Sequence, residues 1–255
     1  MKFIRYEKDN YIRYGILKDN KVMEVEGDIF TNYKLTGITL SLKDIKILAP
    51  VDPSKIIALG YNYKDLVGER SSYDEPIIFI KPNSSIVGPE EKIILKEKRK
   101  SWIEVELGIV IKKTCKNISI KEAHNYIFGY TIANDVTMNN ILGRDHHLIR
   151  SKGWDTFCPI GPHIETELDT SDLSLISKVN GEIMQKSNVN KRILNDFQIV
   201  NLISEKMTLY AGDLIITGTP ANAENSIIKE GDFVELTIEN LGTLSNYVAF
   251  NKDKR

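Results

Sequence analysis

Cysteine is scarce in this sequence: two of the 255 residues are cysteines, Cys115 and Cys158. Two cysteines this widely separated form neither a disulfide framework nor the closely spaced ligand pairs of a zinc site. Because a chain without structural disulfides suits a reducing compartment, we predict a cytoplasmic protein. We expect both thiols to act as small buried apolar groups.

Long apolar runs and an excess of charge of one sign are also missing. No stretch of about 18 apolar residues is present, so no membrane span is expected. Residues 1–7 lack the apolar segment of a signal peptide. Lys and Arg number 34 against 35 Asp and Glu, the net charge is -1, and no basic block occurs. We therefore expect neither a nucleic-acid nor a membrane partner.

The first fifty residues have the pattern of a small β unit. Residues 3–6, 11–17 and 22–25 are rich in aromatic and β-branched side chains, and Asp-Asn pairs between them suit turns. Residues 43–53 end in a segment with two prolines, which favours an extended linker. We therefore predict a small N-terminal β domain at 1–53 and a larger domain at 54–255.

The larger part of the chain contains many short candidate strands and few helices. Apolar or alternating patterns predict strands at 56–60, 76–80, 104–111, 214–217, 234–238 and 243–248. Ser119 with Glu122, and Asn195 with Gln198, are capping pairs that predict two helix starts. The fold class predicted from these patterns is mainly β with few helices, an α+β arrangement.

A group of acidic residues lies at the ends of two apolar segments. In Trp102-Ile103-Glu104-Val105-Glu106-Leu107, side chains alternate between strand faces, so Glu104 and Glu106 point the same way, roughly 6–7 Å apart. Asp135 ends a second apolar segment. A solvated strand edge explains one such pair alone, but the apolar residues that follow Glu106 favour a buried position. Because a hard divalent cation relieves the repulsion among carboxylates, we interpret the three as metal ligands.

At these residues the chain resembles the fumarylacetoacetate hydrolase family, and the likeness extends over nearly the whole sequence. Six matching stretches occur in the family's order: Gly60-Tyr61-Asn62-Tyr63, Phe79-Ile80-Lys81-Pro82, Glu104-Val105-Glu106-Leu107, 129–137, 152–162, and 212–220 followed by Gly231-Asp232.

The resemblance implies a mixed β-roll with a small N-terminal β domain, usually assembled as a homodimer. It also implies that Glu104, Glu106 and Asp135 hold Mg²⁺ or Mn²⁺, and the same oxygen ligands also accept Ca²⁺. By the same resemblance, Lys152 is an active-site lysine and Thr219 contacts the substrate carboxylate. The implied substrate is a small 2-oxo or enol carboxylic acid, whose carbonyl the metal polarises as a Lewis acid.

Two departures from the family pattern affect the expected chemistry. Hydrolytic relatives carry a His and a Glu after the Asn-Tyr pair, and here the matching positions are Leu66 and Glu69. Since leucine cannot move a proton, activation of water by a His-Glu pair is in doubt. Farther along, Asn139 replaces a substrate-binding Arg and Leu142 replaces a Gln, so Asn139 becomes the candidate substrate contact at that place.

Three functions are compatible with this pattern. We place an isomerase or keto-enol tautomerase first, with Glu69 or Lys152 moving the proton, because this reaction needs no activated water. The second is a carbon-carbon hydrolase or a decarboxylase in which another group, such as His146 or His147, replaces the lost His. The third is a relative that binds a metal or ligand without catalysis.

Overall fold

The structure is a computed structural model that describes residues 1–68, 75–141 and 143–251. It is mostly β, as predicted. The described strands of the N-terminal part are β1 (Lys2–Lys8), β2 (Tyr11–Lys18), β3 (Lys21–Gly27), β4 (Tyr33–Ser41) and β5 (Lys46–Leu48). Those of the middle part are β6 (Ile56–Gly60), β7 (Ile77–Lys81), β8 (Ile86–Val87), β9 (Lys92–Leu95), β10 (Ser101–Trp102), β11 (Val105–Ile111), β12 (Ile127–Asn134), β13 (Thr137–Met138) and β14 (Cys158–Glu165). The last are β15 (Ser174–Val179), β16 (Glu182–Asn188), β17 (Leu214–Ile216), β18 (Ile227–Ile228), β19 (Phe233–Ile238) and β20 (Gly242–Phe250).

The N-terminal strands form an antiparallel meander. The turn pairs Asp9-Asn10 and Asp19-Asn20 all have positive φ, between 49° and 63°. This is the conformation of a two-residue type I′ hairpin turn, so the expected turns are confirmed. The predicted linker is only partly irregular, because β5 within it pairs with β1.

The largest sheet continues from the N-terminal meander into the body of the molecule. Its order is β4-β3-β2-β1-β14-β12-β11-β17-β6-β7, with β5 paired to β1 and β8 paired to β14. Strand β11 lies in the centre of this sheet and every one of its residues is buried. A central strand buried on both faces explains its nearly continuous apolar sequence.

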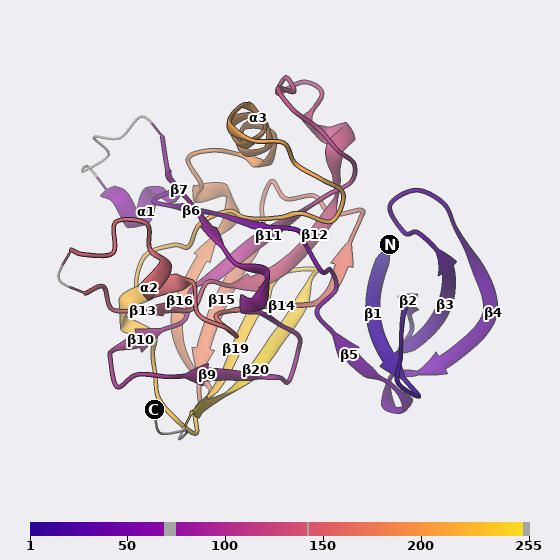
Figure 1. Cartoon of the computed structure of the whole chain (residues 1–255), viewed down its shortest axis with the longest axis horizontal. Helices are drawn as coiled ribbons and strands as arrows, with labels where there is room; N and C mark the ends of the chain where they lie inside the picture. Colours follow the sequence, from indigo (N-terminus) through magenta and orange to yellow (C-terminus); the bar gives the residue numbers. More distant parts are fainter. Residues whose placement is uncertain (69–74, 142, 252–255) are drawn as a thin grey trace.

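A second sheet, in the order β16-β15-β19-β20-β9, packs against the large one. Figure 1 shows its orange and yellow strands beside β11, β12 and β14. The main apolar core lies here and includes Leu107, Ile132, Leu175, Leu236 and Leu244. Both cysteines are buried and unpaired, as expected.

The described α-helices are α1 (Lys64–Val67), α2 (Ile149–Lys152) and α3 (Asp196–Lys206). The predicted cap of α3 is confirmed, because Asn195 and Gln198 form a complete capping box. The helix predicted after Ser119 is wrong. Ser119 does donate to Glu122, but only a single 3₁₀ turn, Ala123–Tyr126, follows before β12 begins.

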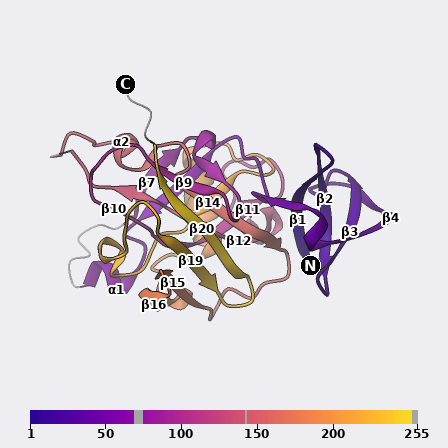
Figure 2. The ribbon, with the colours of Figure 1, turned by 90° about the horizontal axis from the view of Figure 1, so that it is seen from below.

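The N-terminal meander and the short helices α1 and α2 lie at opposite ends of the molecule. Figures 1 and 2 show the meander at one end, while α1, α2, β10 and β13 gather at the other. Within the described residues, no helix is both long and apolar enough to cross a membrane.

Candidate active site

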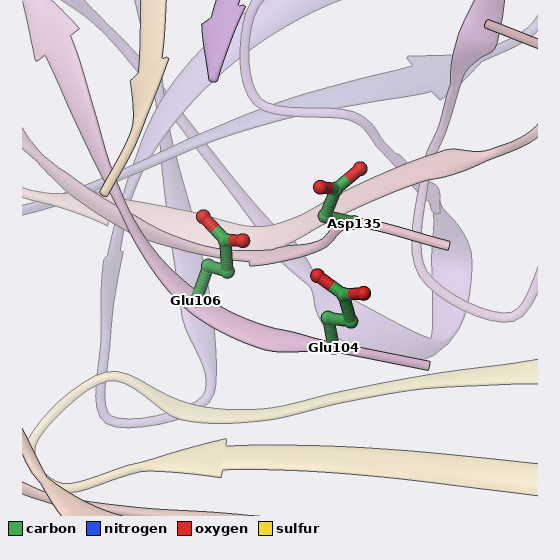
Figure 3. Close-up of side chains that lie close together, drawn as sticks. All are labelled: Glu104, Glu106 and Asp135. Atoms are coloured by element: carbon green, nitrogen blue, oxygen red, sulfur yellow. The ribbon is translucent and has the colours of Figure 1, made fainter. Parts of the chain in front are cut away.

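Three carboxylates converge where β11 begins and β12 ends, side by side. Glu104 immediately precedes β11, Glu106 lies within it, and Asp135 follows β12. Because the strands are antiparallel and Glu106 pairs with Ala133, these ends are neighbours. One oxygen from each carboxylate lies within 4.8 Å of the other two, and the side chains project to the same side of the strands (Figure 3).

Hydrogen bonds hold two of these carboxylates in place. Glu104 Oε1 accepts from Trp102 Nε1 at 2.7 Å and from Thr137 Oγ1 at 2.8 Å. Glu106 Oε2 accepts from the backbone N–H of Gly218 at 2.7 Å. Gly218 has a φ of +96°, and a Cβ there would lie 3.0 Å from the Cβ of Asn62. This position therefore requires glycine for the loop to approach Glu106.

Two lysines contact these carboxylates, one from a strand and one from a helix. Lys81 Nζ at the end of β7 donates to Asp135 Oδ1 at 2.5 Å, and its side chain is fully buried. Lys152 Nζ at the end of α2 donates to Asp135 Oδ2 at 2.5 Å and to Glu104 Oε2 at 3.1 Å. We call Glu104, Glu106, Asp135, Lys81 and Lys152 the acidic cluster; its three acids face two cations.

Burial and neighbouring charge shift the pKa values of the acidic cluster in opposite directions. Burial, reinforced by Asp135 and Glu104, raises the pKa of Glu106 well above its ordinary value. Burial also acts to raise the pKa of Asp135, but Lys152 and Lys81 outweigh it and lower that pKa. Burial acts to lower the pKa of Lys152, but Asp135 and Glu104 outweigh it and raise that pKa. The negative charge of Glu106 is therefore less compensated than that of Asp135.

The donor set fits a hard divalent cation. Three carboxylates supply oxygen ligands of the kind that Mg²⁺ and Mn²⁺ prefer, at a place where the Lys152 ammonium already bridges two of them. A divalent cation would also compensate Glu106, whose carboxylate accepts from Gly218 rather than from a lysine. Glu104, Glu106 and Asp135 are accordingly the residues that would hold it.

A small cavity opens above the acidic cluster, with a volume of about 230 Å³. Its buried lining, here called the floor, includes Glu104, Asp135, Thr137 and Thr219 together with the half-buried Lys152. Its exposed lining, here called the rim, consists of Tyr61, Ile77 and Glu224. The cavity is smaller than the roughly 300–1,000 Å³ of pockets for drug-sized ligands, so it suits a small acid.

The structure brings most of the predicted site residues to this cavity. Lys152 and Thr219 line it, and so does Leu66 of α1, which the family resemblance matches to a His. Asn139 is exposed and does not belong to the described lining. Glu69 and Leu142 lie outside the described residues.

The two adjacent histidines face a neighbouring groove. His146 and His147 are exposed and line this groove with Ile77, Phe79 and Leu148. Neither belongs to the described lining of the acidic cavity. The geometry therefore gives no support to either as a replacement for the missing family His.

Two supporting residues were missed by reasoning from sequence. Lys81 ends the apolar strand β7, and a lysine at the end of such a run is typical of a solvated position. Gln185 of β16 is fully buried, and its Nε2 donates to Thr219 Oγ1 at 2.9 Å and to Pro220 O at 3.1 Å. It accepts from the backbone N–H of Val105 at 3.2 Å and so ties the Thr219 loop to β11. The quoted Phe79-Ile80-Lys81-Pro82 stretch was the available signal for Lys81; we find none for Gln185.

Comparison with known proteins identifies the family. The family model described as fumarylacetoacetate (FAA) hydrolase C-terminal matches residues 55–249, and a second, Rv2993c-like N-terminal, matches residues 1–50. The chain belongs to the fumarylacetoacetate hydrolase family.

Relatives with several different names are similar to this chain. An uncharacterized protein of Methanocaldococcus jannaschii is 46% identical over 83% of this chain and 87% of its own length. The mitochondrial oxaloacetate tautomerase FAHD2A of Bos taurus is 38% identical over 82% of this chain and 71% of its own length. The 2,4-didehydro-3-deoxy-L-rhamnonate hydrolase of a Sphingomonas species is 40% identical over 98% of this chain and 96% of its own length.

Solved structures show the same fold. That of 2-hydroxyhepta-2,4-diene-1,7-dioate isomerase from Mycobacterium marinum has a TM-score of 0.91 and 38% identity, and covers 99% of this chain and 100% of its own. Maleylpyruvate hydrolase from Sphingobium sp. SYK-6, in complex with manganese (II) and pyruvate, has a TM-score of 0.82 and 25% identity, covering 99% and 100%.

Proposed function

We propose that this chain is a divalent-metal-dependent enzyme that interconverts the keto and enol forms of small 2-oxo carboxylic acids. The observation that carries the proposal is the convergence of three carboxylate oxygens within 4.8 Å, two of them from residues that line a small cavity together with Lys152. The isomerase and tautomerase names of similar proteins support this reaction class.

The metal is proposed to be Mg²⁺ or Mn²⁺, with Ca²⁺ accepted by the same oxygens, held by Glu104, Glu106 and Asp135. When bound, it would polarise the 2-oxo group as a Lewis acid and stabilise negative charge that develops on that oxygen. The manganese and pyruvate in the maleylpyruvate hydrolase structure support such a pairing.

The remaining groups would bind the substrate and move its proton. Keto-enol conversion removes one proton from C3 and adds one to the C2 oxygen, so it needs one acceptor and one donor. Lys152 is proposed to donate at the oxygen, and its position in the cavity lining supports this role. Thr219 is proposed to hydrogen-bond the substrate carboxylate, in a loop fixed by Gln185. Glu69 stays the proposed acceptor at carbon.

Carbon-carbon hydrolysis is a second candidate, favoured by the likeness to the rhamnonate-derived hydrolase over 98% of this chain. Such a reaction needs a group that activates water. Leu66 occupies the wall position where hydrolytic relatives carry His, and His146 and His147 line the adjacent groove. We therefore place hydrolysis behind keto-enol conversion.

The decisive experiment measures exchange of the C3 hydrogens of 2-oxo acids with deuterium, by NMR, with and without Mg²⁺ or Mn²⁺. Carbon-carbon cleavage is followed in the same samples. Metal-dependent exchange without cleavage is expected, with a loss of at least about 100-fold in Glu106→Gln, since removal of one transition-state-stabilising group has effects of this order.

Two results would change the assignment. Cleavage at a rate comparable to exchange would show that the chain is a hydrolase or decarboxylase with another water-activating group. Tight metal binding without exchange or cleavage across the panel would favour a binding role. The homodimer implied by the family resemblance stays a prediction.

A further inference from the structure

The rim of the cavity carries an isolated negative charge. Glu224 belongs to a short 3₁₀ turn, Ala223–Asn225, which follows the Thr219 loop. Its side chain is exposed and lines the cavity. Among the residues that the structure describes, Glu224 has neither an ion-pair partner nor a hydrogen-bond partner. A carboxylate with free acceptor oxygens therefore faces any part of a bound substrate that extends from the floor to the rim.

The same rim presents a tyrosine held in an uncommon backbone conformation. Tyr61 has a φ of +63°, in the left-handed region that bulky residues rarely adopt. Its side chain is 51% exposed and lines the cavity. Such strain persists where the surrounding structure over-determines a position, and Asn62 next to it is buried and bonded to the Thr217 carbonyl at 2.8 Å. The phenol is thereby directed to the rim with its hydroxyl free of any partner in the described part of the chain.

The walls between floor and rim offer no charge. Leu66 and Leu148 are apolar, and Lys152 is the one cation among the described lining residues. The Lys152 ammonium is already bonded to Asp135 and Glu104 on the floor. A second carboxylate at the far end of a substrate would therefore meet Glu224, a like charge, without a cation from the described lining to balance it.

We propose that Glu224 and Tyr61 select 2-oxo monocarboxylic acids with a neutral, hydroxyl-bearing tail and disfavour 2-oxo dicarboxylates. This inference rests on the proposed function, in which the 2-oxo and carboxylate groups occupy the floor. A tail hydroxyl donates to the Glu224 carboxylate and accepts from the Tyr61 phenol. A tail carboxylate donates to Glu224 only when it is protonated, so at neutral pH the two like charges repel and its placement beside Glu224 is unfavourable.

The test uses three acids of equal chain length: 5-hydroxy-2-oxopentanoate, 2-oxopentanoate and 2-oxoglutarate. Metal-dependent deuterium exchange at C3 gives kcat/KM for each. The wild type is expected to prefer the hydroxy acid over 2-oxoglutarate by about tenfold or more. In Glu224→Gln the ratio of kcat/KM for the hydroxy acid to kcat/KM for 2-oxoglutarate is expected to fall at least threefold. In Glu224→Lys this ratio is expected to fall further or to invert, and the effect should be larger at low ionic strength. Tyr61→Phe is expected to lower kcat/KM several-fold for the hydroxy acid and to leave kcat/KM for the other two acids unchanged. Glu182→Gln, an exposed glutamate in β16 outside the cavity lining, is the matched charge control.

A measurement of binding tests the selection of acids independently of the exchange reaction. Calorimetric Kd values of the three acids for the metal-loaded wild type and Glu224→Lys are expected to show the same reordering. Exchange that proceeds with unaltered ratios in both Glu224 variants overturns the inference and leaves the proposed function intact. Absence of exchange with every acid contradicts the proposed function. In that case the Kd ratios alone test the role of the rim. Kd ratios that are the same in wild type and Glu224→Lys refute selection by the rim, and Kd ratios that change order support it.

Discussion

The floor and the rim of the cavity are built from different kinds of contact. On the floor, Glu104 and Asp135 are buried, and each carboxylate receives at least two hydrogen bonds or ion pairs. On the rim, the exposed Tyr61 and Glu224 have no polar partner within the described residues. Fixed groups suit a metal centre, which tolerates little displacement, whereas groups with free hydrogen-bonding capacity suit the recognition of a variable substrate tail. Under the proposed function, chemistry and selectivity would be set by separate sets of side chains.

The largest expected effect comes from removing a buried cation behind the floor. Lys81→Met leaves the Asp135 carboxylate with Lys152 as its remaining ionic partner. Because breaking a buried pair leaves an uncompensated charge, the free energy of unfolding should fall by about 3–5 kcal/mol. Chemical denaturation of the metal-free protein measures this.

A matched lysine outside the cluster provides the control. Lys96 pairs with the exposed Asp155 at 3.0 Å, so Lys96→Met should change the free energy of unfolding by no more than about 1 kcal/mol. Equal losses in the two variants would contradict a special role for Lys81. Failure of Lys81→Met to fold, beside a normally folded Lys96→Met, would agree with it.

The next effect is a pH dependence caused by Glu106. The pKa of Glu106 is raised in the folded protein. As pH rises above the pKa of Glu106 in the unfolded chain, the unfolded chain therefore loses the carboxyl proton before the folded protein does. Stability is therefore lost between the unfolded and the folded pKa, with a slope of up to about 1.4 kcal/mol per pH unit. In Glu106→Gln this part of the slope should disappear.

The measurement is the free energy of unfolding of both proteins across pH 4–8 without metal, taken as a difference so that other titrating groups cancel. The variant should become relatively more stable as pH rises. A saturating divalent cation should reverse the sign for the wild type, since it binds the deprotonated carboxylate. A difference that stays constant with pH would contradict the assignment.

A smaller change is expected from placing a proton-transfer group in the wall. Leu66→His restores the residue type of hydrolytic relatives at a position that lines the cavity. Cleavage of an acylpyruvate should rise by about tenfold or more above the wild-type rate, because a positioned general base contributes about 10²–10⁴-fold. Leu66→Asn is the control for polarity without proton transfer. Equal cleavage by both variants would show that the wall position does not limit hydrolysis.

Much of the β architecture was predictable from local patterns. Alternation and Asp-Asn turns located β1, β2, β3 and β19, because a half-buried hairpin determines both signals. The pattern of residues 43–53 did not reveal β5, since its pairing with β1 depends on a partner distant in sequence. The capping pair at Ser119 was present, but a capping pair does not determine helix length, and one 3₁₀ turn follows before β12 begins. The predicted boundary between residues 53 and 54 stays a prediction.

The candidate site was predictable where acids end apolar strands. Glu104, Glu106 and Asp135 met the expectation of a common location, because antiparallel pairing brings those strand ends together. Lys81 was not recognised, since an apolar run that ends in lysine does not show whether that lysine is solvated or paired inside a charged cluster. The rim residues also escaped notice, because their importance depends on which loops close around the cavity rather than on spacing along the chain.

The smallest effect is expected at Asn139, the residue proposed from sequence as a substrate contact. Its side chain is exposed and outside the described lining, and its backbone N–H donates to Lys100 O at 2.8 Å. Since the substitution removes no contact inside the cavity, Asn139→Ala should change kcat/KM for any 2-oxo acid by less than about twofold. A tenfold rise in KM, with kcat unchanged, would instead show that this segment closes over the bound substrate. The division between floor and rim would then need a third, mobile part.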